Sequence, residues 1–250
     1  MASIIKSNAV KLLKAIIVCA ICLVIWEILA ISVDDSYFLP HVQETFVSLF
    51  MLIGKKGFLK TVATSLIRVL AGLVIGIISG VLLATVSHIL PLANTFISTV
   101  ISIMKATPIA AIILILWFTF TDAALAVFVV ILMVTPGVWQ NVYDGYRSIS
   151  KDMLEVCEIF EFDFEKKLRI LIIPTVIKYL IPAVITSIGL AWKAEIAAEI
   201  MTYSNIGRSI QDFKTLHYDT SSVFAWAIVI IAFSIILEQL TKYFLKRIKL

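Results

Sequence analysis

Long apolar runs separated by short polar segments dominate the chain. A helix needs about 20 largely apolar residues to cross the hydrocarbon core of a bilayer. We predict six membrane-spanning helices, at residues 15–31, 65–86, 96–118, 123–142, 176–200 and 223–240. The pattern therefore indicates an all-α, polytopic membrane protein, with residues 1–250 as a single transmembrane domain.

The first apolar run has two interpretations. Lys6, Lys11 and Lys14 precede it, as basic residues precede the apolar part of a secretory signal. The run is long, however, it contains Trp26 and Glu27, and no convincing small-residue cleavage site follows it. These features favour an uncleaved membrane helix.

Two polar stretches between the runs have a helical period. Apolar residues recur at Val42, Phe46, Leu49 and Phe50. They recur again at Ile206, Ile210 and Phe213. We expect two short amphipathic helices that lie in the outer membrane interface.

One segment departs from the apolar character of the chain. The charged segment, residues 152–169, carries eight acidic or basic side chains between Glu155 and Arg169. Its apolar residues fall at steps of three or four, at Leu154, Cys157, Phe160, Phe164 and Leu168. This spacing predicts one apolar stripe along a helical segment, with a possible bend in the Glu161–Glu165 run.

The charged segment is too amphipathic to cross a membrane. It could be a solvated helix that lies on the membrane surface. It could also be a docking element for a soluble partner, since a helix that faces a partner outside the bilayer must be compatible with water.

Composition supports the membrane assignment. The chain is 61% hydrophobic and 15% charged, with a mean hydropathy of +1.04, whereas soluble domains are about one quarter charged. The net charge of +4 is too small to indicate a nucleic-acid partner. Cys19, Cys22 and Cys157 have no second ligand pair nearby, so we interpret them as lipid-facing or packed thiols.

The distribution of Lys and Arg predicts the orientation. Cytoplasmic ends of spans are enriched in these residues. With six spans, the N-terminal, central and C-terminal polar segments lie on one side, and they hold three, six and four such residues, thirteen in total. The opposing segments hold five: Lys55, Lys56, Lys60, Arg208 and Lys214. Both termini are therefore predicted to be cytoplasmic.

Several residues inside the predicted spans are candidates for packing or transport. Gly72, Gly76 and Gly80 recur every four residues, and small residues at this spacing let helices approach closely, within one chain or across a dimer. Arg68 either reaches the outer interface or pairs with an acidic residue of a neighbouring helix. Lys105 either marks a translocation path or anchors the helix at an interface.

The predicted fifth span carries two carboxylates. Trp192, Glu195 and Glu199 share one helix face, and both glutamates approach the outer end of the span. Ionisable groups within a span usually face a cavity or a partner, so these residues are candidates for the translocation path. Alternatively, Glu199 anchors the helix end in water.

The charged segment also resembles a known motif. ABC importer permeases of the nitrate/sulfonate/taurine type carry a cytoplasmic loop with an EAA sequence, a glycine and a terminal I-x-L-P. Here Glu155, Val156 and Cys157 stand at EAA, and residues 171–174 end at Pro174 with the matching spacing. Glu161 stands where the family has glycine, which is a departure.

Further motifs occur in the order of this family along nearly the whole chain. The segments 64–72, 107–118 and 191–207 are similar to its S-L-x-R-V-x-x-G, T-P-containing and A-W…A-E…G-[LI]-G regions, respectively. Each motif is weak alone, but their order and spacing together identify the chain as a member of this permease family.

The resemblance implies a mechanism and a set of partners. The loop at about 148–174 would be the coupling helix that seats on an ABC ATPase, through Glu155, Val156, Cys157, Phe160, Glu161 and Pro174. Two ATPase subunits, a second permease copy (a homodimer) and an extracytoplasmic solute-binding protein would complete the importer in a bacterial inner (plasma) membrane. ATP and Mg would bind to the ATPase, and this chain would bind no cofactor. It has no G-x-x-x-x-G-K-[ST] phosphate loop.

Two other classes of function were weighed. A secondary transporter or channel would also consist of apolar helices, but it would not need a partner-docking loop. An integral membrane enzyme would need an acid/base or metal-ligand cluster, and His41, His88 and His217 are scattered along the sequence. We therefore predict a non-enzymatic permease whose solute, of the nitrate, sulfonate, taurine or thiamine-precursor class, the sequence does not specify.

Overall fold

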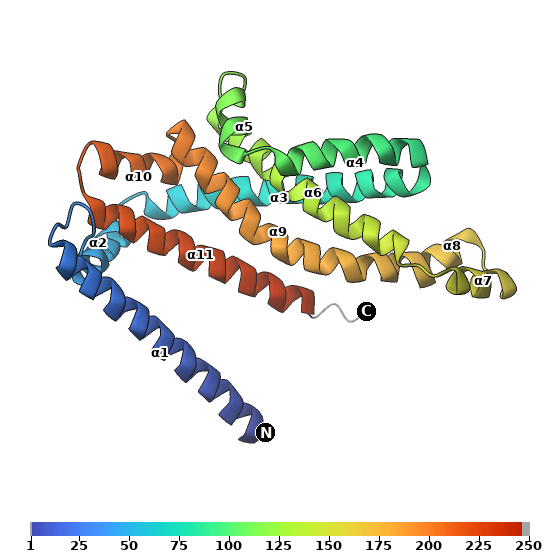
Figure 1. Cartoon of the computed structure of the whole chain (residues 1–250), viewed down its shortest axis with the longest axis horizontal. Coiled ribbons are helices and arrows are strands. Elements are labelled where there is room, and N and C mark those ends of the chain that lie inside the picture. Colours follow the sequence, from blue (N-terminus) through green and yellow to red (C-terminus); the bar gives the residue numbers. More distant parts are fainter. Residues whose placement is uncertain (1, 247–250) are drawn as a thin grey trace. The chain divides into compact units, whose positions relative to one another are not determined.

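A computed structural model describes residues 2–246, and every regular element in this part of the chain is helical. In chain order these elements, shown in Figure 1, are α1 (Ala2–Val33), α2 (Val42–Gly54), α3 (Phe58–Ile89), α4 (Pro91–Ala106), α5 (Ile109–Leu116), α6 (Asp122–Arg147), α7 (Lys151–Ile159), α8 (Phe164–Lys167), the π-helical turn η1 (Leu168–Ile172), α9 (Ile173–Thr202), α10 (Asn205–Thr215) and α11 (Thr220–Lys246). The all-α prediction is confirmed.

Five of the basic residues that predict the orientation lie near the ends of the chain. Arg247 and Lys249 lie outside the described residues. Lys6, Lys11 and Lys246 lie outside the residues whose side chains are described.

Five helical stretches are long and apolar enough to cross a membrane. They correspond to five of the six predicted spans and are Ile16–Val33, Phe58–Ile89, Asp122–Arg147, Phe164–Thr202 and Thr220–Leu245. Cys19 and Cys22 in the first stretch are exposed, whereas Cys157 is buried. The predicted short helices after the first and fifth spans are present as α2 and α10.

The remaining predicted span, residues 96–118, is not one straight helix. It is divided into α4 and α5, whose axes are bent by 97°. Pro108 has no N–H and disfavours helical backbone at the residue before it. Thr107 accordingly has extended backbone angles, φ −80° and ψ 127°. Counting the bent pair as one span gives six.

The chain divides into two compact units, which we describe separately. One comprises Met1–Leu59 with Ile210–Ile230, and the other Lys60–Ser209 with Ile231–Leu250. The assignment of residues 1–250 to a single domain stays a prediction.

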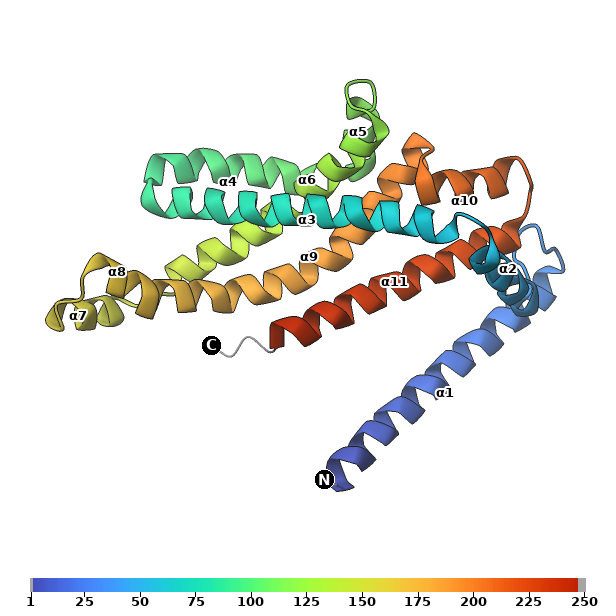
Figure 2. The ribbon, with the colours of Figure 1, turned by 180° about the vertical axis from the view of Figure 1, so that it is seen from behind.

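Glycine–valine contacts hold α3 against α6 in the larger unit. A Cβ atom added at Gly72 would lie 2.6 Å from Val130 Cβ, and one at Gly80 would lie 2.7 Å from Val138 Cβ. Gly76 faces Val134 in the same way, at 2.9 Å. The predicted close approach of the glycine row therefore occurs within the chain. Figures 1 and 2 show α4 returning along α3.

A second set of contacts in this unit joins α5, α6 and α9. Ile113 of α5 and Leu125, Ala126 and Val129 of α6 form a buried cluster with Ala194 and Ala198 of α9. The small side chains on α9 let α6 pack closely along its length.

The smaller unit is held by aromatic contacts and hydrogen bonds. Trp26 of α1 packs against Phe224 at 5.5 Å between ring centroids, and its indole Nε1 donates a hydrogen bond to the Pro40 carbonyl. Phe58 packs against Trp226 at the same centroid distance. The aromatic contacts join the first turns of α11 to α1 and to the start of α3.

Candidate functional site

The charged segment folds as two short helices. Ser150 caps α7, with its Oγ accepting a hydrogen bond from the Met153 N–H at 3.3 Å. Asp163 caps α8, with its carboxylate accepting from the Lys166 N–H at 2.9 Å. Each cap satisfies a backbone N–H that has no partner within its helix.

The interruption between α7 and α8 corrects the predicted single stripe. Glu161 adopts a left-handed backbone conformation with φ +48°, which ends α7. Glycine adopts this conformation without steric cost. Glu161, which replaces the glycine of the family motif, therefore has the left-handed backbone conformation that a glycine at this position would adopt easily.

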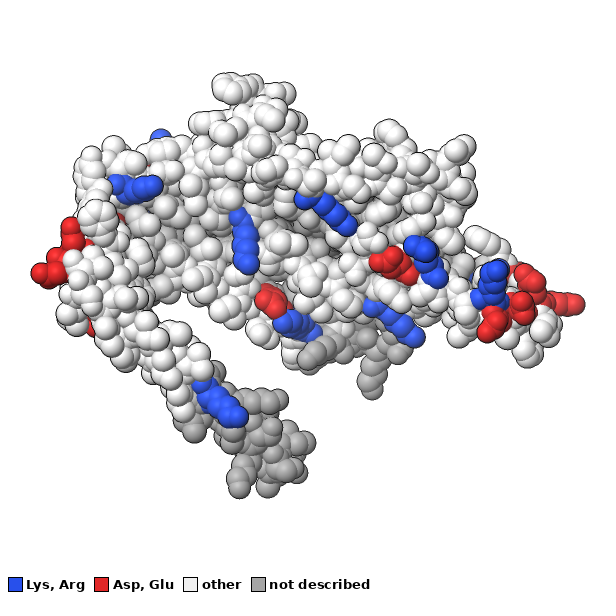
Figure 3. Space-filling model, in the orientation of Figure 1, with Lys and Arg blue, Asp and Glu red and all other residues white. Residues whose placement is uncertain are grey.

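The apolar residues of the charged segment consequently point in different directions. Cys157 is buried, whereas Phe160 and Phe164 are 67% and 76% exposed. Val156 is also exposed, and so are Glu155 and Glu161. Figure 3 shows acidic and basic side chains gathered over α7 and α8. The surface of these two helices combines charge with large exposed apolar side chains, as docking surfaces do.

The turn that leads from α8 into α9 contains Pro174. This residue lies in the first turn of α9, directly after the π-helical η1, and it is half-buried. The helix continues without a break from Phe164 to Thr202, so Pro174 lies inside it and lacks the N–H of a helical residue. The motif's last residue therefore lies next to the π-helical turn, where the hydrogen-bond pattern changes.

A buried carboxylate cluster lies near the other end of α9. The Glu199 side chain is fully buried and accepts hydrogen bonds from Ser65 Oγ at 2.9 Å and Arg68 Nη1 at 3.1 Å. Its second oxygen accepts from the Ile206 N–H at 3.1 Å. Of the two interpretations of Arg68, the ion pair is therefore the one observed. Glu199 is not a helix-end anchor in water.

Glu199 also organises the turn between α9 and α10. Its backbone carbonyl accepts hydrogen bonds from the N–H groups of Tyr203 and Ser204. A Cβ atom at Gly207 would lie 2.0 Å from the carbonyl carbon of Glu199, which no side chain can tolerate. Gly207 in the A-E…G-[LI]-G region is thus required by the close approach of α10 to the backbone of α9.

Glu195 and Trp192 share the buried face with Glu199. Both are fully buried within the chain. Neither carboxyl oxygen of Glu195 accepts a hydrogen bond from a described residue. The face that the sequence indicated as a path therefore points into the subunit in this conformation, and a direct contact of these side chains with solute stays a prediction.

Lys105 lies at the last turn of α4, next to the break before α5. Its Nζ donates a hydrogen bond to Gln140 Oε1 of α6 at 3.3 Å. Gln140 in turn donates to the carboxylate of Asp144 at 3.1 and 3.2 Å. Lys105 is exposed, so both of its interpretations, path residue and anchor, stay open.

A family model described as "Binding-protein-dependent transport system inner membrane component" matches residues 72–250. The chain belongs to this family. Its members are transport permeases, so the chain is a multi-pass inner-membrane transport protein of the ABC permease type. The family resemblance found in the sequence is confirmed.

Two relatives and one solved structure support this assignment. The chain is 22% identical over 221 residues to a Bacillus subtilis (strain 168) protein named as an aliphatic sulfonates transport permease, SsuC, covering 87% of this chain and 79% of that protein. It is 22% identical over 213 residues to a Methanocaldococcus jannaschii protein named as an ABC transporter permease, with 81% and 78% covered. The fold resembles a crystal structure of an amino acid ABC transporter with histidines (TM-score 0.62, 16% identity, 81% of this chain and 95% of that chain).

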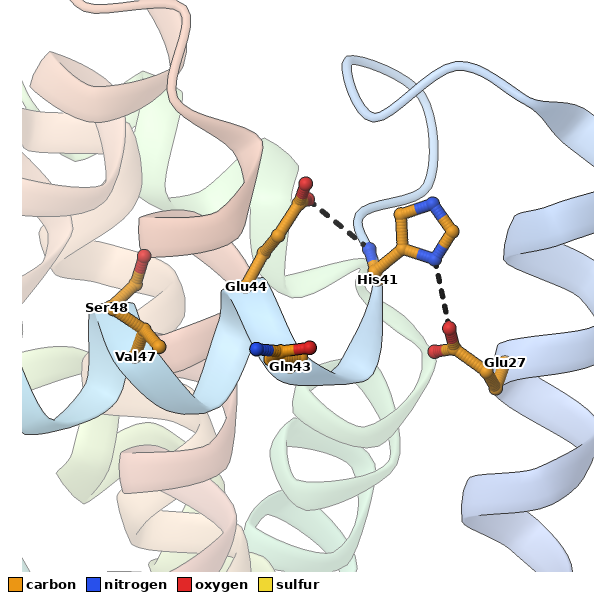
Figure 4. A pocket seen from close by; sticks show the side chains of 6 residues that line it. All are labelled: Glu27, His41, Gln43, Glu44, Val47 and Ser48. Atoms are coloured by element: carbon orange, nitrogen blue, oxygen red, sulfur yellow. Dashed lines mark hydrogen bonds and ion pairs between the residues drawn. The ribbon is translucent and has the colours of Figure 1, made fainter.

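The permease also has a polar pocket between α1 and α2, which sequence reasoning missed. The pocket, of about 470 Å³, is lined by Glu27, His41, Glu44 and neighbouring residues (Figure 4). His41 Nδ1 lies 2.9 Å from Glu27 Oε1, and the Val42 N–H donates to Glu27 Oε2. The hydrogen bond to Glu27 raises the pKa of His41, although desolvation opposes the shift. The signal in the sequence is Glu27 itself, because a carboxylate within a predicted span usually faces a cavity or a partner.

Metal binding has no candidate in the part of the chain that the structure describes. No three His, Cys, Asp or Glu side chains come together there. The described polar groups discussed above instead gather in three places: the charged segment, the cluster around Glu199, and the contact between Glu27 and His41.

Proposed function

We propose that this chain is the membrane-spanning subunit of an ABC importer whose ATP hydrolysis takes place on a partner ATPase. The surface of α7 and α8 carries the proposal. Helices this short bury little surface of their own, yet they present Val156, Phe160 and Phe164 beside exposed carboxylates. Large exposed apolar side chains outside the membrane have a physical reason if a partner covers them.

The assembly follows from the same family. A second copy of the permease, forming a homodimer, would pair with two ATPase subunits that hold ATP and Mg. An extracytoplasmic binding protein would deliver the solute. We place both termini and the charged segment in the cytoplasm, in line with the distribution of Lys and Arg.

The solute is proposed to be a small sulfonate-class compound. This rests on the resemblance to the nitrate/sulfonate/taurine type and on the name of the Bacillus subtilis relative. Five residues were predicted to line the path, and Lys105 is the exposed one among them. It lies beside the break between α4 and α5, where a solute would reach it. Arg68, Trp192, Glu195 and Glu199 would support the path from inside the subunit.

Co-purification with the ATPase tests the proposal. Glu155→Arg, or deletion of residues 156–160, should leave an inserted permease that no longer retains the ATPase. Asp122→Arg is the matched control, because Asp122 is an exposed carboxylate at the opposite end of α6.

Retention of the ATPase by the deletion variant would contradict the assignment of α7 and α8. Solute uptake into liposomes that contain the permease without any ATPase would favour a secondary transporter or channel instead.

A further inference from the structure

The face of α9 opposite Glu195 and Glu199 is accessible and partly polar. Thr186, Leu190 and Lys193 are exposed along it, and Gly189 lies among them. These positions are three, four or seven residues apart, so they form one stripe on the helix. The stripe belongs to the part of α9 that the subunit leaves uncovered.

Lys193 lies at membrane depth. It precedes the last residue of α9, Thr202, by nine residues, or about 14 Å at 1.5 Å per residue. A charged amino group at such a position is costly in hydrocarbon and usually faces a partner or a water-filled cavity. Among the described residues, Lys193 has no ion-pair or hydrogen-bond partner.

The stripe forms one wall of a cleft. The cleft, of about 400 Å³, is lined by Thr186, Gly189 and Lys193 of α9 and by Glu238 and Lys242 of α11. Glu238 and Lys242 form an ion pair with each other, so their charges compensate. Lys193 therefore supplies the uncompensated charge of the cleft, which is positive.

Most of the surface in the view of Figure 3 is uncharged, with single Lys and Arg side chains set apart in its central part. An uncompensated positive charge in such surroundings acts at longer range than it would in water, because the medium screens it less. It favours a mobile anion over a neutral or cationic molecule.

From these observations we propose that the cleft between α9 and α11 is part of the solute path, and that Lys193 contacts the anionic group of the solute. This proposal rests on the proposed function. It adds the residue that contacts the solute, the face of α9 that lines the path, and the sign of the solute's charge. The occupant is the anionic solute, because its charge is complementary to that of the cleft. Gly189 leaves room beside the lysine.

Charge-selective labelling of a cysteine in the cleft tests this proposal. Thr186→Cys would be introduced into a chain in which Cys19, Cys22 and Cys157 are replaced, purified as the complete complex. The probes are two membrane-impermeant methanethiosulfonates of similar size, one with an anionic sulfonate and one with a cationic trimethylammonium group. Position 186 lies roughly 10 Å along the helix from Lys193.

We expect Thr186→Cys to react with both probes and to favour the anionic one. Adding Lys193→Gln should lower the ratio of anionic to cationic rates by about fourfold or more. One charge about 10 Å away acts on the two probes with opposite sign, and fourfold is the value in bulk water. Lys178→Gln is the matched control, because Lys178 is exposed on the same helix near its cytoplasmic end. It should change the ratio less than Lys193→Gln, because water and salt at the membrane surface screen the charge of Lys178.

Several results would overturn the proposal. Absence of reaction with either probe would mean that lipid or a second copy covers the face. An equal ratio with and without Lys193 would mean that the lysine does not set the charge of the cleft. These outcomes do not depend on ATPase recruitment. If the chain binds no ATPase but its cleft is open to water and favours the anionic probe, only the proposed function is refuted.

Discussion

Several polar contacts of the larger unit converge on Glu199. Its carboxylate accepts hydrogen bonds from a hydroxyl, a guanidinium and a backbone N–H, and all of these donors lie within 3.1 Å. A buried ion pair with satisfied hydrogen bonds is stable, but removing one partner leaves an uncompensated charge. Glu195, one turn away on the same buried face, has no such donors.

We predict that Glu199→Gln destabilises the permease and that Glu195→Gln does not. The first change strands the Arg68 guanidinium, whose side chain is only 17% exposed, and should cost about 3–5 kcal/mol. The second replaces a buried carboxyl whose oxygens accept no hydrogen bond from a described residue, so stability should be unchanged or higher. Thermal unfolding of the purified variants in detergent measures both. Equal midpoints for the two variants would contradict the prediction.

The same pair of variants separates folding from transport. If Glu195 contributes to the path as predicted, Glu195→Gln slows solute uptake while the protein stays folded. Normal coupled uptake in liposomes would show that it is only a buried side chain.

At the scale of elements, α3 and α6 are joined by a row of glycines against a row of valines. The glycine Cα atoms lie where any side chain would collide with Val130, Val134 or Val138. Apolar surface provides little driving force between helices in lipid, so close van der Waals packing of this kind holds the pair together.

We predict that Gly76→Leu separates α3 from α6 and lowers stability by about 1–3 kcal/mol, the usual cost of overpacking. Val134→Ala removes the opposing methyl groups, so the double variant should recover part of the loss. Gly137→Leu is the control, because a Cβ atom there meets no atom within 4 Å. Thermal midpoints equal to the parent for Gly76→Leu would show that the helices do not need this contact.

At the scale of the whole molecule, the bent pair α4–α5 decides the topology. If the pair crosses the membrane, the chain has six spans and both termini lie on one side. If it enters and returns on the same side, the chain has five spans, and every segment after α5 changes sides.

We predict six spans, and three single cysteines test this in the cysteine-free chain. Asp152→Cys should react with an impermeant maleimide only from the cytoplasmic side, whereas Ser36→Cys and Asp122→Cys should react only from outside. All three positions are exposed. Inverted vesicles expose the cytoplasmic side to the maleimide, and right-side-out vesicles expose the outer side. In a five-span chain, Asp122→Cys and Asp152→Cys would both change sides while Ser36→Cys would not.

Much of the fold was determined by the sequence itself, because membrane insertion depends on local properties. Five spans, the two short helices α2 and α10, and the charged segment follow from runs and periods of neighbouring residues. Pro108 was visible in the sequence, but proline is tolerated in spanning helices, so its presence alone did not predict a 97° bend.

Only the tertiary structure decided which residues meet and which helix faces are covered. Arg68 and Glu199 are separated by 131 residues, and local periodicity contains no information about such a contact. The buried and accessible faces of α9 could not be distinguished either, because faces toward lipid and faces toward protein are both apolar in a membrane. The path candidates Trp192, Glu195 and Glu199 consequently lie inside the subunit. Lys193 is accessible, and its exposure depends on how α6 and α11 pack around α9.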